Sequence, residues 1–341
     1  MVSKAGTSET RQRQTIEGRE RNCSVGRTIA ILSDAWTFLV IREAFFGATR
    51  FEEFRSALHI PRGTLTDRLK KLTQRGIFRQ THYSATSSRL DYHLTRSGIE
   101  LYPSFIAMMQ FGDKWLAGPE GPPLTLIHAD CGCVSHPFVA CSHCGTAVTA
   151  VRVTYRDGPG AGHTPVETAK RVRRASDSAP FSRGRPSSVS RTLEIIGNRW
   201  SFLIIREAFF GVRRFDQLIM ELRIAPNILA DRLSRLVADG IFERRKYQDL
   251  PERFEYRLTD MGKDLYGAFI VMGAWGDRWL SGGEPPLLLL HKDCGHDFTP
   301  MVICDRCRKP IDAPAMKYRM AYNPETFGTA TMSERGAPEE N

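Results

Sequence analysis

The feature that most constrains this chain is that most of it is written twice. The heptapeptide Ile41–Gly47 recurs unchanged at Ile205–Gly211, 164 residues further on. The same offset relates Trp36 to Trp200, and it falls to 163 near the cysteines. Each copy spans about 130 residues, well above the period of solenoid repeats. The copies are therefore expected to be domains.

Hydrophobic periodicity predicts the elements inside each copy. In the first copy, Leu65, Leu69 and Leu72 recur at spacings of four and three, which predicts one buried stripe on a helix that begins at Pro61. Leu229, Leu233 and Leu236 repeat the stripe in the second copy. The other expected elements of the first copy are helices over 25–32, 38–46, 51–58 and 95–116, and a hairpin of strands 77–83 and 90–94. The second hairpin is expected from strands 241–247 and 254–258.

Composition narrows the class of protein. Lys and Arg number 48 against 38 Asp and Glu, and the pI is about 9.3, so nucleic acid is a plausible partner. The N-terminal segment lacks the apolar stretch of a signal peptide, and no run of about 18 apolar residues predicts a membrane span. We therefore expect a cytoplasmic protein without a membrane partner. Thiols stay reduced in that compartment, so clustered cysteines indicate metal binding.

Seven of the eight cysteines lie in two short segments with the spacing of metal knuckles. We expect two structural zinc ions per chain, one for each copy, because thiolates and imidazole in a closed tetrahedral set select zinc. Either the first histidine of each segment or the alternatives Cys133 and His296 complete the two sets. The expected ligands are His128, Cys131, Cys141 and Cys144 in the first copy, and His291, Cys294, Cys304 and Cys307 in the second.

The predicted fold class is mainly α with small β wings (α+β). It consists of two tandem winged helix-turn-helix domains, each followed by a small zinc ribbon. The expected division is a disordered N-terminus (1–21), the first winged domain (22–117), the first ribbon (118–155), a linker (156–186), the second winged domain (187–281), the second ribbon (282–323) and a disordered tail (324–341).

A set of short motifs resembles the HxlR-type winged-helix regulators of the MarR-like superfamily, over about 95 residues of each copy. In the first copy they are Cys23-Ser24-Val25, Arg27-Thr28, Asp67-Arg68-Leu69, Gly76-Ile77 and Tyr92-X-Leu94-Thr95-X-X-Gly98. In the second they are Arg191-Thr192, Ile196-Gly197, Asp231-Arg232-Leu233, Asp239-Gly240-Ile241 and Tyr256-X-Leu258-Thr259. The resemblance implies a bacterial transcriptional regulator that acts as a dimer, and it allows Cys23 to serve as a thiol sensor. The tandem fusion and the cysteine-rich extensions depart from the family pattern.

The helix that carries the leucine stripe is the expected recognition helix, and its opposite face would enter the major groove. The arginines beside the stripe, Arg68 and Arg232, are interpreted as internal ion-pair partners. The wings would touch phosphates or the minor groove. The predicted DNA contacts are Arg62, Thr64, Thr66, Asp67, Lys70, Lys71 and Arg89 in the first copy, and Asn227, Asp231, Ser234, Arg235, Arg245, Lys246 and Arg253 in the second.

These patterns predict a sequence-specific regulator of transcription, a repressor, that binds double-stranded DNA. The alternative is a zinc-dependent interaction scaffold, or a thiol- or ligand-responsive sensor, without base-specific reading. No phosphate loop, nucleophile elbow or paired-carboxylate motif is present, so we expect no enzyme. The long C-terminal helices of the two winged domains would make either a homodimer or a pseudo-dimer within one chain.

Overall fold

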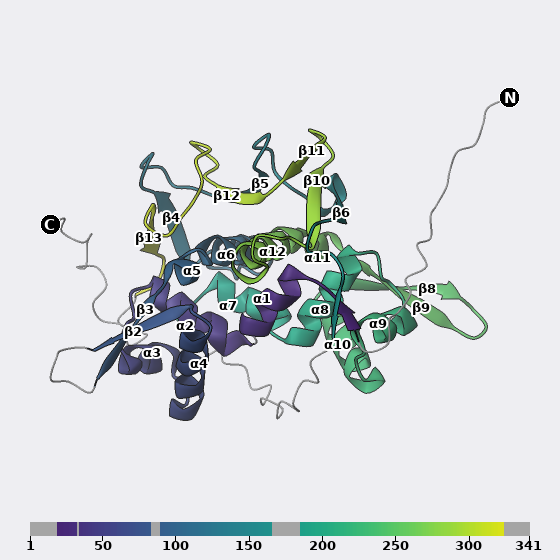
Figure 1. Ribbon diagram of the computed structural model, residues 1–341, viewed down its shortest axis with the longest axis horizontal. Helices are drawn as coiled ribbons and strands as arrows, with labels where there is room; N and C mark the ends of the chain where they lie inside the picture. Colours follow the sequence, from purple (N-terminus) through teal and green to yellow (C-terminus); the bar gives the residue numbers. More distant parts are fainter. Residues whose placement is uncertain (1–18, 33, 83–88, 166–184, 324–341) are drawn as a thin grey trace.

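The computed structural model describes residues 19–32, 34–82, 89–165 and 185–323 (Figure 1). The tail expected over 324–341 and most of the expected N-terminal segment and linker lie outside these residues. At the ends of those two segments the structure has strands that the sequence analysis did not predict. Arg19–Arg21 forms β1, which pairs antiparallel with β7 (His163–Pro165) inside the range predicted as linker.

The first copy has the predicted order of helices and hairpin, except that two helices replace the expected last one. Its elements are α1 (Ser24–Leu32), α2 (Ala35–Phe45), α3 (Phe51–Leu58), α4 (Arg62–Gln74), the hairpin of β2 (Phe78–His82) and β3 (Leu90–Leu94), α5 (Arg96–Ile99) and α6 (Tyr102–Trp115). The second copy repeats them as α7 (Ser188–Ile196), α8 (Arg199–Phe209), α9 (Phe215–Leu222), α10 (Pro226–Ala238), the hairpin of β8 (Phe242–Gln248) and β9 (Arg253–Leu258), α11 (Asp260–Asp264) and α12 (Tyr266–Leu280).

Two helix boundaries correct the sequence prediction. Pro61 is the residue before α4 rather than its first residue. The single long helix expected over 95–116 is two helices, α5 and α6, and the second copy breaks in the same way. Pro103 and Gly267 are the second residues of α6 and α12, and both residue types are unfavourable inside a continuous helix.

The two copies pack against each other through exchanged helices. α1 of the first copy lies against α12 of the second, and α7 of the second copy lies against α6 of the first. The contact is close, because a Cβ added to Gly112 of α6 would lie 2.2 Å from the carbonyl oxygen of Ser188. One hydrophobic core therefore runs through both copies. Of the two arrangements that the sequence left open, the structure has the pseudo-dimer within one chain.

The remaining strands form a layer on one side of α6 and α12 (Figure 1). They are β4 (Leu124–His128), β5 (Phe138–Cys141), β6 (Val153–Asp157), β10 (Leu287–His291), β11 (His296–Phe298), β12 (Pro300–Ile303) and β13 (Met316–Met320), with one turn of 3₁₀ helix, η1 (Ala150–Arg152). Strands pair between copies: β5 with β12, β4 with β13, and β6 with β10. Two separate ribbons, one after each winged domain, were the wrong expectation, because β4, β5 and β6 of the first copy all pair with strands of the second, although β10 also pairs with β11 of its own copy.

No single helix in the described part of the chain is long and apolar enough to cross a membrane. α1 and α2 together are long and apolar enough for a membrane span, but the chain bends by 82° between them.

Candidate nucleic-acid interface and metal centres

The two predicted recognition helices, α4 and α10, project from the same side of the molecule (Figure 1). The hairpins β2–β3 and β8–β9 lie at its two outer ends, and the layer of strands lies on the opposite side. Leu65, Leu69 and Leu72 of α4 are buried as the sequence predicts, and so are their counterparts in α10. The burial of these stripes turns the polar faces of both helices outward.

The outer face of α4 is basic with one carboxylate. Arg62, Thr66, Lys70 and Lys71 are exposed, and Thr64 and Asp67 are half-buried. Lys71 Nζ lies 2.9 Å from a carboxylate oxygen of Asp67. Burial would raise the pKa of Asp67, but the hydrogen bond and charge of Lys71, with the charge of Arg68, hold that pKa below its usual value. Asp67 is therefore an ionised acceptor on this face.

Arg68 pairs internally, as the sequence indicates. One of its guanidinium nitrogens lies 2.9 Å from Asp34, whose side chain also accepts the backbone N–H of Thr37 at the start of α2. The second copy has Asn198 at the start of α8, and there Arg232 lies 3.6 Å from Asp231. Arg68 thus belongs to the scaffold behind the reading face, whereas Arg232 pairs with an exposed carboxylate on that face.

The outer face of α10 differs from that of α4. Asn227, Asp231, Ser234 and Arg235 are all exposed. Arg235 Nε lies 3.3 Å from Asp231, one turn earlier on the helix. The amide of Asn227, the second residue of α10, is suited to an adenine edge. α4 has Gly63 at the equivalent position, and its first side-chain amide is that of Gln74. The outer faces of the two helices therefore carry different groups.

The wings carry further basic residues, several of them in ion pairs. Arg245 lies 2.6 Å from Glu243, and Lys246 lies 3.0 Å from Asp249 and 2.9 Å from Glu252. The hydrogen bonds from Lys246 to Glu252 and Asp249 raise the pKa of the ammonium group. The remaining predicted wing residues, Arg89 and Arg253, are exposed at the starts of the second strands of their hairpins. Two carboxylates thus neutralise Lys246 where it stands.

The cysteine and histidine knuckles converge in two clusters, each built from both copies. In the first cluster, Nδ1 of His128 lies 3.2 Å from Sγ of Cys307 and 3.6 Å from Sγ of Cys131. Sγ of Cys131 lies 3.9 Å from Sγ of Cys304. All four donor atoms lie within 4.8 Å of one another.

The second cluster has the same geometry. Nδ1 of His291 lies 3.3 Å from Sγ of Cys144 and 3.6 Å from Sγ of Cys294. Sγ of Cys141 lies 3.9 Å from Sγ of Cys294. The expectation that the four ligands of each copy share one site is therefore wrong. β5 and β12 run antiparallel across the pair, so they deliver Cys141 and Cys304 to opposite clusters.

All four knuckles use the same turn. The residue after the second ligand donates its N–H to the carbonyl of the first ligand, and it has positive φ in each case. These residues are Gly132, Gly145, Gly295 and Arg308, with φ between 64° and 71°. The turn aims the two side chains of a knuckle at one point, whichever copy supplies the other knuckle.

The donor sets fit a tetrahedral metal ion. Bonds of about 2.3 Å to sulfur put neighbouring donors of a tetrahedron about 3.8 Å apart, close to the observed spacings. His128 and His291 are fully buried with Nδ1 toward the thiols, and Nε2 of each has no hydrogen-bond partner. Nε2 of His291 lies 3.6 Å from Asp293, a carboxylate placed to orient the ring. The alternatives Cys133 and His296 are exposed and lie outside both clusters.

One thiol in each cluster is favoured as the thiolate. The hydroxyl and N–H of Thr146 lower the pKa of Cys144 to about 6. Burial would raise the pKa of Cys304, but hydrogen bonds from the hydroxyl of Ser135 and from backbone N–H groups lower it to about 6. The thiolate is the form that binds metals.

Cys23 lies apart from the clusters, beside the start of α1. Its sulfur accepts the N–H of Gly26 at 3.4 Å. The side chain of Arg206 lies beside this sulfur. Burial would lower the pKa of Arg206, but its interactions with Glu207 and with Cys23 raise that pKa. Ser187, the counterpart of Cys23, caps α7 by accepting the N–H of Ser190.

The architecture defines the class of protein: two winged helix-turn-helix units, each with an exposed recognition helix. The model of the HxlR-like helix-turn-helix family matches residues 31–119 and 195–284, which is more than half of the chain. The protein therefore belongs to this family. Its two matched regions agree with the tandem duplication predicted from the sequence.

Similar proteins carry the same description. The chain is 44% identical over 137 residues to the HTH-type transcriptional regulator Rv3095 of Mycobacterium tuberculosis, covering 40% of this chain and 87% of the relative. It is 37% identical over 93 residues to the HTH-type transcriptional regulator YtcD of Bacillus subtilis, covering 26% of this chain and 71% of the relative. The solved structure of PA1374, a candidate transcription factor from Pseudomonas aeruginosa, is 39% identical over 31% of this chain and 73% of that chain, with a TM-score of 0.25. The two curated relatives named here are called HTH-type transcriptional regulators.

Proposed function

We propose that the protein is a sequence-specific DNA-binding repressor in which one chain supplies both reading heads of a dimer. The observation that carries this proposal is that α4 and α10 project from the same side of a single core. In dimeric helix-turn-helix proteins, the two recognition helices enter successive major grooves about 34–36 Å apart. The net charge of +10 adds attraction to the phosphates.

The reading heads differ, so the preferred site is asymmetric. Asn227 is the residue most suited to reading a base, an adenine, in the second half-site. Lys70, which is exposed on α4, would contact a phosphate in the first half-site. A homodimer with two identical recognition helices would instead prefer two equal half-sites.

Zinc is the proposed metal in both clusters, with two ions per chain in a structural role. Three thiolates and one imidazole leave no open position for substrate, which favours structure over catalysis. Each ion would join a knuckle of one copy to a knuckle of the other. When bound, zinc supplies cross-links that hold the two copies, and hence α4 and α10, in one arrangement.

The test compares DNA binding by single-residue variants on a duplex selected from a random pool. Asn227→Ala should weaken binding by about 1–3 kcal/mol and relax the preference at one base pair. Lys70→Ala should weaken binding to all sequences alike and reduce the salt slope by about one. Lys317→Ala is the matched control, because Lys317 is an exposed lysine of β13, in the layer of strands on the opposite side.

Unchanged binding by both reading-face variants would contradict the proposal. It would favour the second candidate, a zinc-dependent scaffold or a sensor without base reading. The position of Cys23 beside the half-buried Arg206 is the observation that favours a thiol-responsive role.

A further inference from the structure

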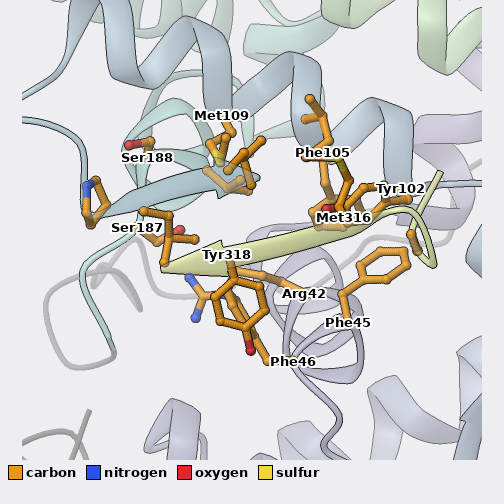
Figure 2. A pocket seen from close by; sticks show the side chains of 16 residues that line it. Arg42, Phe45, Phe46, Tyr102, Phe105, Met109, Ser187, Ser188, Met316 and Tyr318 are labelled. Carbon is orange, nitrogen blue, oxygen red and sulfur yellow. The ribbon is translucent and has the colours of Figure 1, made fainter. Parts of the chain in front are cut away.

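A partly enclosed apolar pocket of about 90 Å³ lies where the two copies meet (Figure 2). It is smaller than a cavity of about 150 Å³ that holds benzene. The guanidinium of Arg42 on its wall is bonded to Glu43 and to Ser190, each at 2.6 Å. Arg185 of the second copy pairs with the same Glu43 at 2.8 Å. The pocket is thus part of the joint between the copies.

The tip of the second wing, the turn between β8 and β9, carries a bare apolar side chain. Leu250 is 91% exposed, more than any other large apolar side chain in the described part of the chain. The aromatic rings of this wing each have a guanidinium over them. That of Arg244 lies 3.4 Å from the centre of the Phe254 ring, and that of Arg214 lies 4.6 Å from the centre of the Tyr247 ring. Burial of Leu250 against a partner would remove this apolar surface from water.

The turn that holds Leu250 is braced by its own side chains. Lys246 Nζ lies 3.0 Å from a carboxylate oxygen of Asp249 and 2.9 Å from one of Glu252, and these two acids lie on either side of Leu250 in the chain. The side-chain amide of Gln248 donates to the carbonyl oxygen of Leu250 at 3.0 Å. Because these bonds restrict the turn in advance, less conformational entropy is lost when Leu250 is buried.

The charge of the tip favours the floor of a DNA groove over the phosphates. In residues 246–253, Lys246 and Arg253 are balanced by Asp249 and Glu252, so this stretch has no net charge. Attraction to phosphates depends on a surplus of basic residues. Apolar side chains, leucine among them, instead enter between base pairs from the minor groove. A neutral, apolar tip therefore fits a base step better than the DNA backbone.

The hairpin lies where its tip can reach a minor groove. Figure 1 shows β8–β9 at the outer end of the second winged domain, beyond α9 and α10. When α10 lies in a major groove, a hairpin on its outer side meets the neighbouring minor groove. That groove is about 6 Å wide, so it admits one side chain from the turn and excludes the two-stranded hairpin itself.

The sequence of the first wing differs at this place. With the offset of 164, Leu250 corresponds to Thr86 and Pro251 corresponds to Ser87. Thr86 and Ser87 lie outside the described residues. A large apolar residue at this position is a property of the second copy.

We infer that Leu250 is a wedge that enters the minor groove beside the second half-site and opens one base step. The inference rests on the proposed function, because it needs α10 in the adjacent major groove. TA and CA steps unstack most easily, so the wedge adds a preference for one of these steps at a place that no polar side chain reads. It also makes the preferred site more asymmetric.

The test replaces single adenines beside the second half-site of the selected duplex by 2-aminopurine, which brightens when its neighbours unstack. We expect the full-length, metal-loaded protein to brighten one position. Leu250→Thr, which introduces the residue of the first wing, should abolish this signal and weaken binding about fivefold to tenfold. Its salt slope should stay that of the parent, because no phosphate contact is lost. Leu250→Met keeps an apolar side chain and should keep the signal.

Val151→Thr is the matched control and should behave as the parent does. Val151 is 65% exposed in η1, which precedes β6 in the layer of strands on the opposite side. A duplex that stays dark at every position with the parent, or brightens equally with Leu250→Thr, overturns the wedge and leaves the proposed function standing. A parent that binds no duplex selectively overturns the proposed function, and the wedge with it.

Discussion

Gly112→Ala tests the crossing of α6 and α7, on which the joining of the two copies depends. At an ordinary helical position, alanine in place of glycine stabilises by about 0.5–1 kcal/mol. At Gly112 the new Cβ would lie 2.2 Å from the carbonyl oxygen of Ser188 and 2.9 Å from its Cβ. The atom in the way is a backbone carbonyl of α7, which cannot move aside as a side chain can, so the whole helix must shift. Overpacking of this kind costs about 1–3 kcal/mol. The overlap outweighs the helix propensity, and the net loss should be about 1–2 kcal/mol.

The assay is chemical denaturation of the full-length, metal-loaded protein, with the midpoint and slope both recorded. Gly63→Ala is the control, because Gly63 lies in α4 and a Cβ there would meet nothing within 4 Å. That variant should gain up to about 1 kcal/mol. If Gly112→Ala is as stable as the parent, or gains as Gly63→Ala does, the close crossing of α6 and α7 is refuted.

Two further predictions concern the metal centres and the reading scaffold. Cys304→Ser should lower the zinc content of the chain from two ions to one. The NMR signals of His128 should shift and those of His291 should not, because Cys304 belongs to the cluster of His128. Cys133→Ser is the control and should keep both ions, because Cys133 lies outside both clusters. Asp34→Ala should lower the free energy of unfolding by about 1 kcal/mol through loss of the cap on α2, and further because Arg68 loses its ion-pair partner. Asp34→Asn should restore only the cap, as Asn198 caps α8 in the second copy, and should be intermediate in stability. Equal stability of Asp34→Ala and the parent would contradict the capping role.

Much of each winged domain follows from local pattern. The leucine stripe of α4 fixes which face is buried, and the duplicated motifs fix the order of elements. The break before α6 was missed because a strong apolar pattern runs across Leu101, although Pro103 was a visible signal. Boundaries depend on such single residues more than on periodicity.

The partners of the knuckles could not be predicted from spacing. All four knuckles fold in the same way locally, so the sequence indicates which residues ligate and leaves open which pairs meet. That choice depends on the antiparallel pairing of β5 with β12, a contact between copies. The buried group of Arg42, Glu43 and Arg185 was missed for the same reason, since Arg185 lies far along the chain in a segment that reads as linker.

The central claim is that one chain forms a complete two-headed DNA reader. Native mass spectrometry of the full-length protein, alone and on a selected asymmetric duplex, tests it most directly. The account predicts one chain with two zinc ions in free solution, and one such chain per duplex in the complex. Two chains per duplex, with each chain using only one recognition helix, would contradict it.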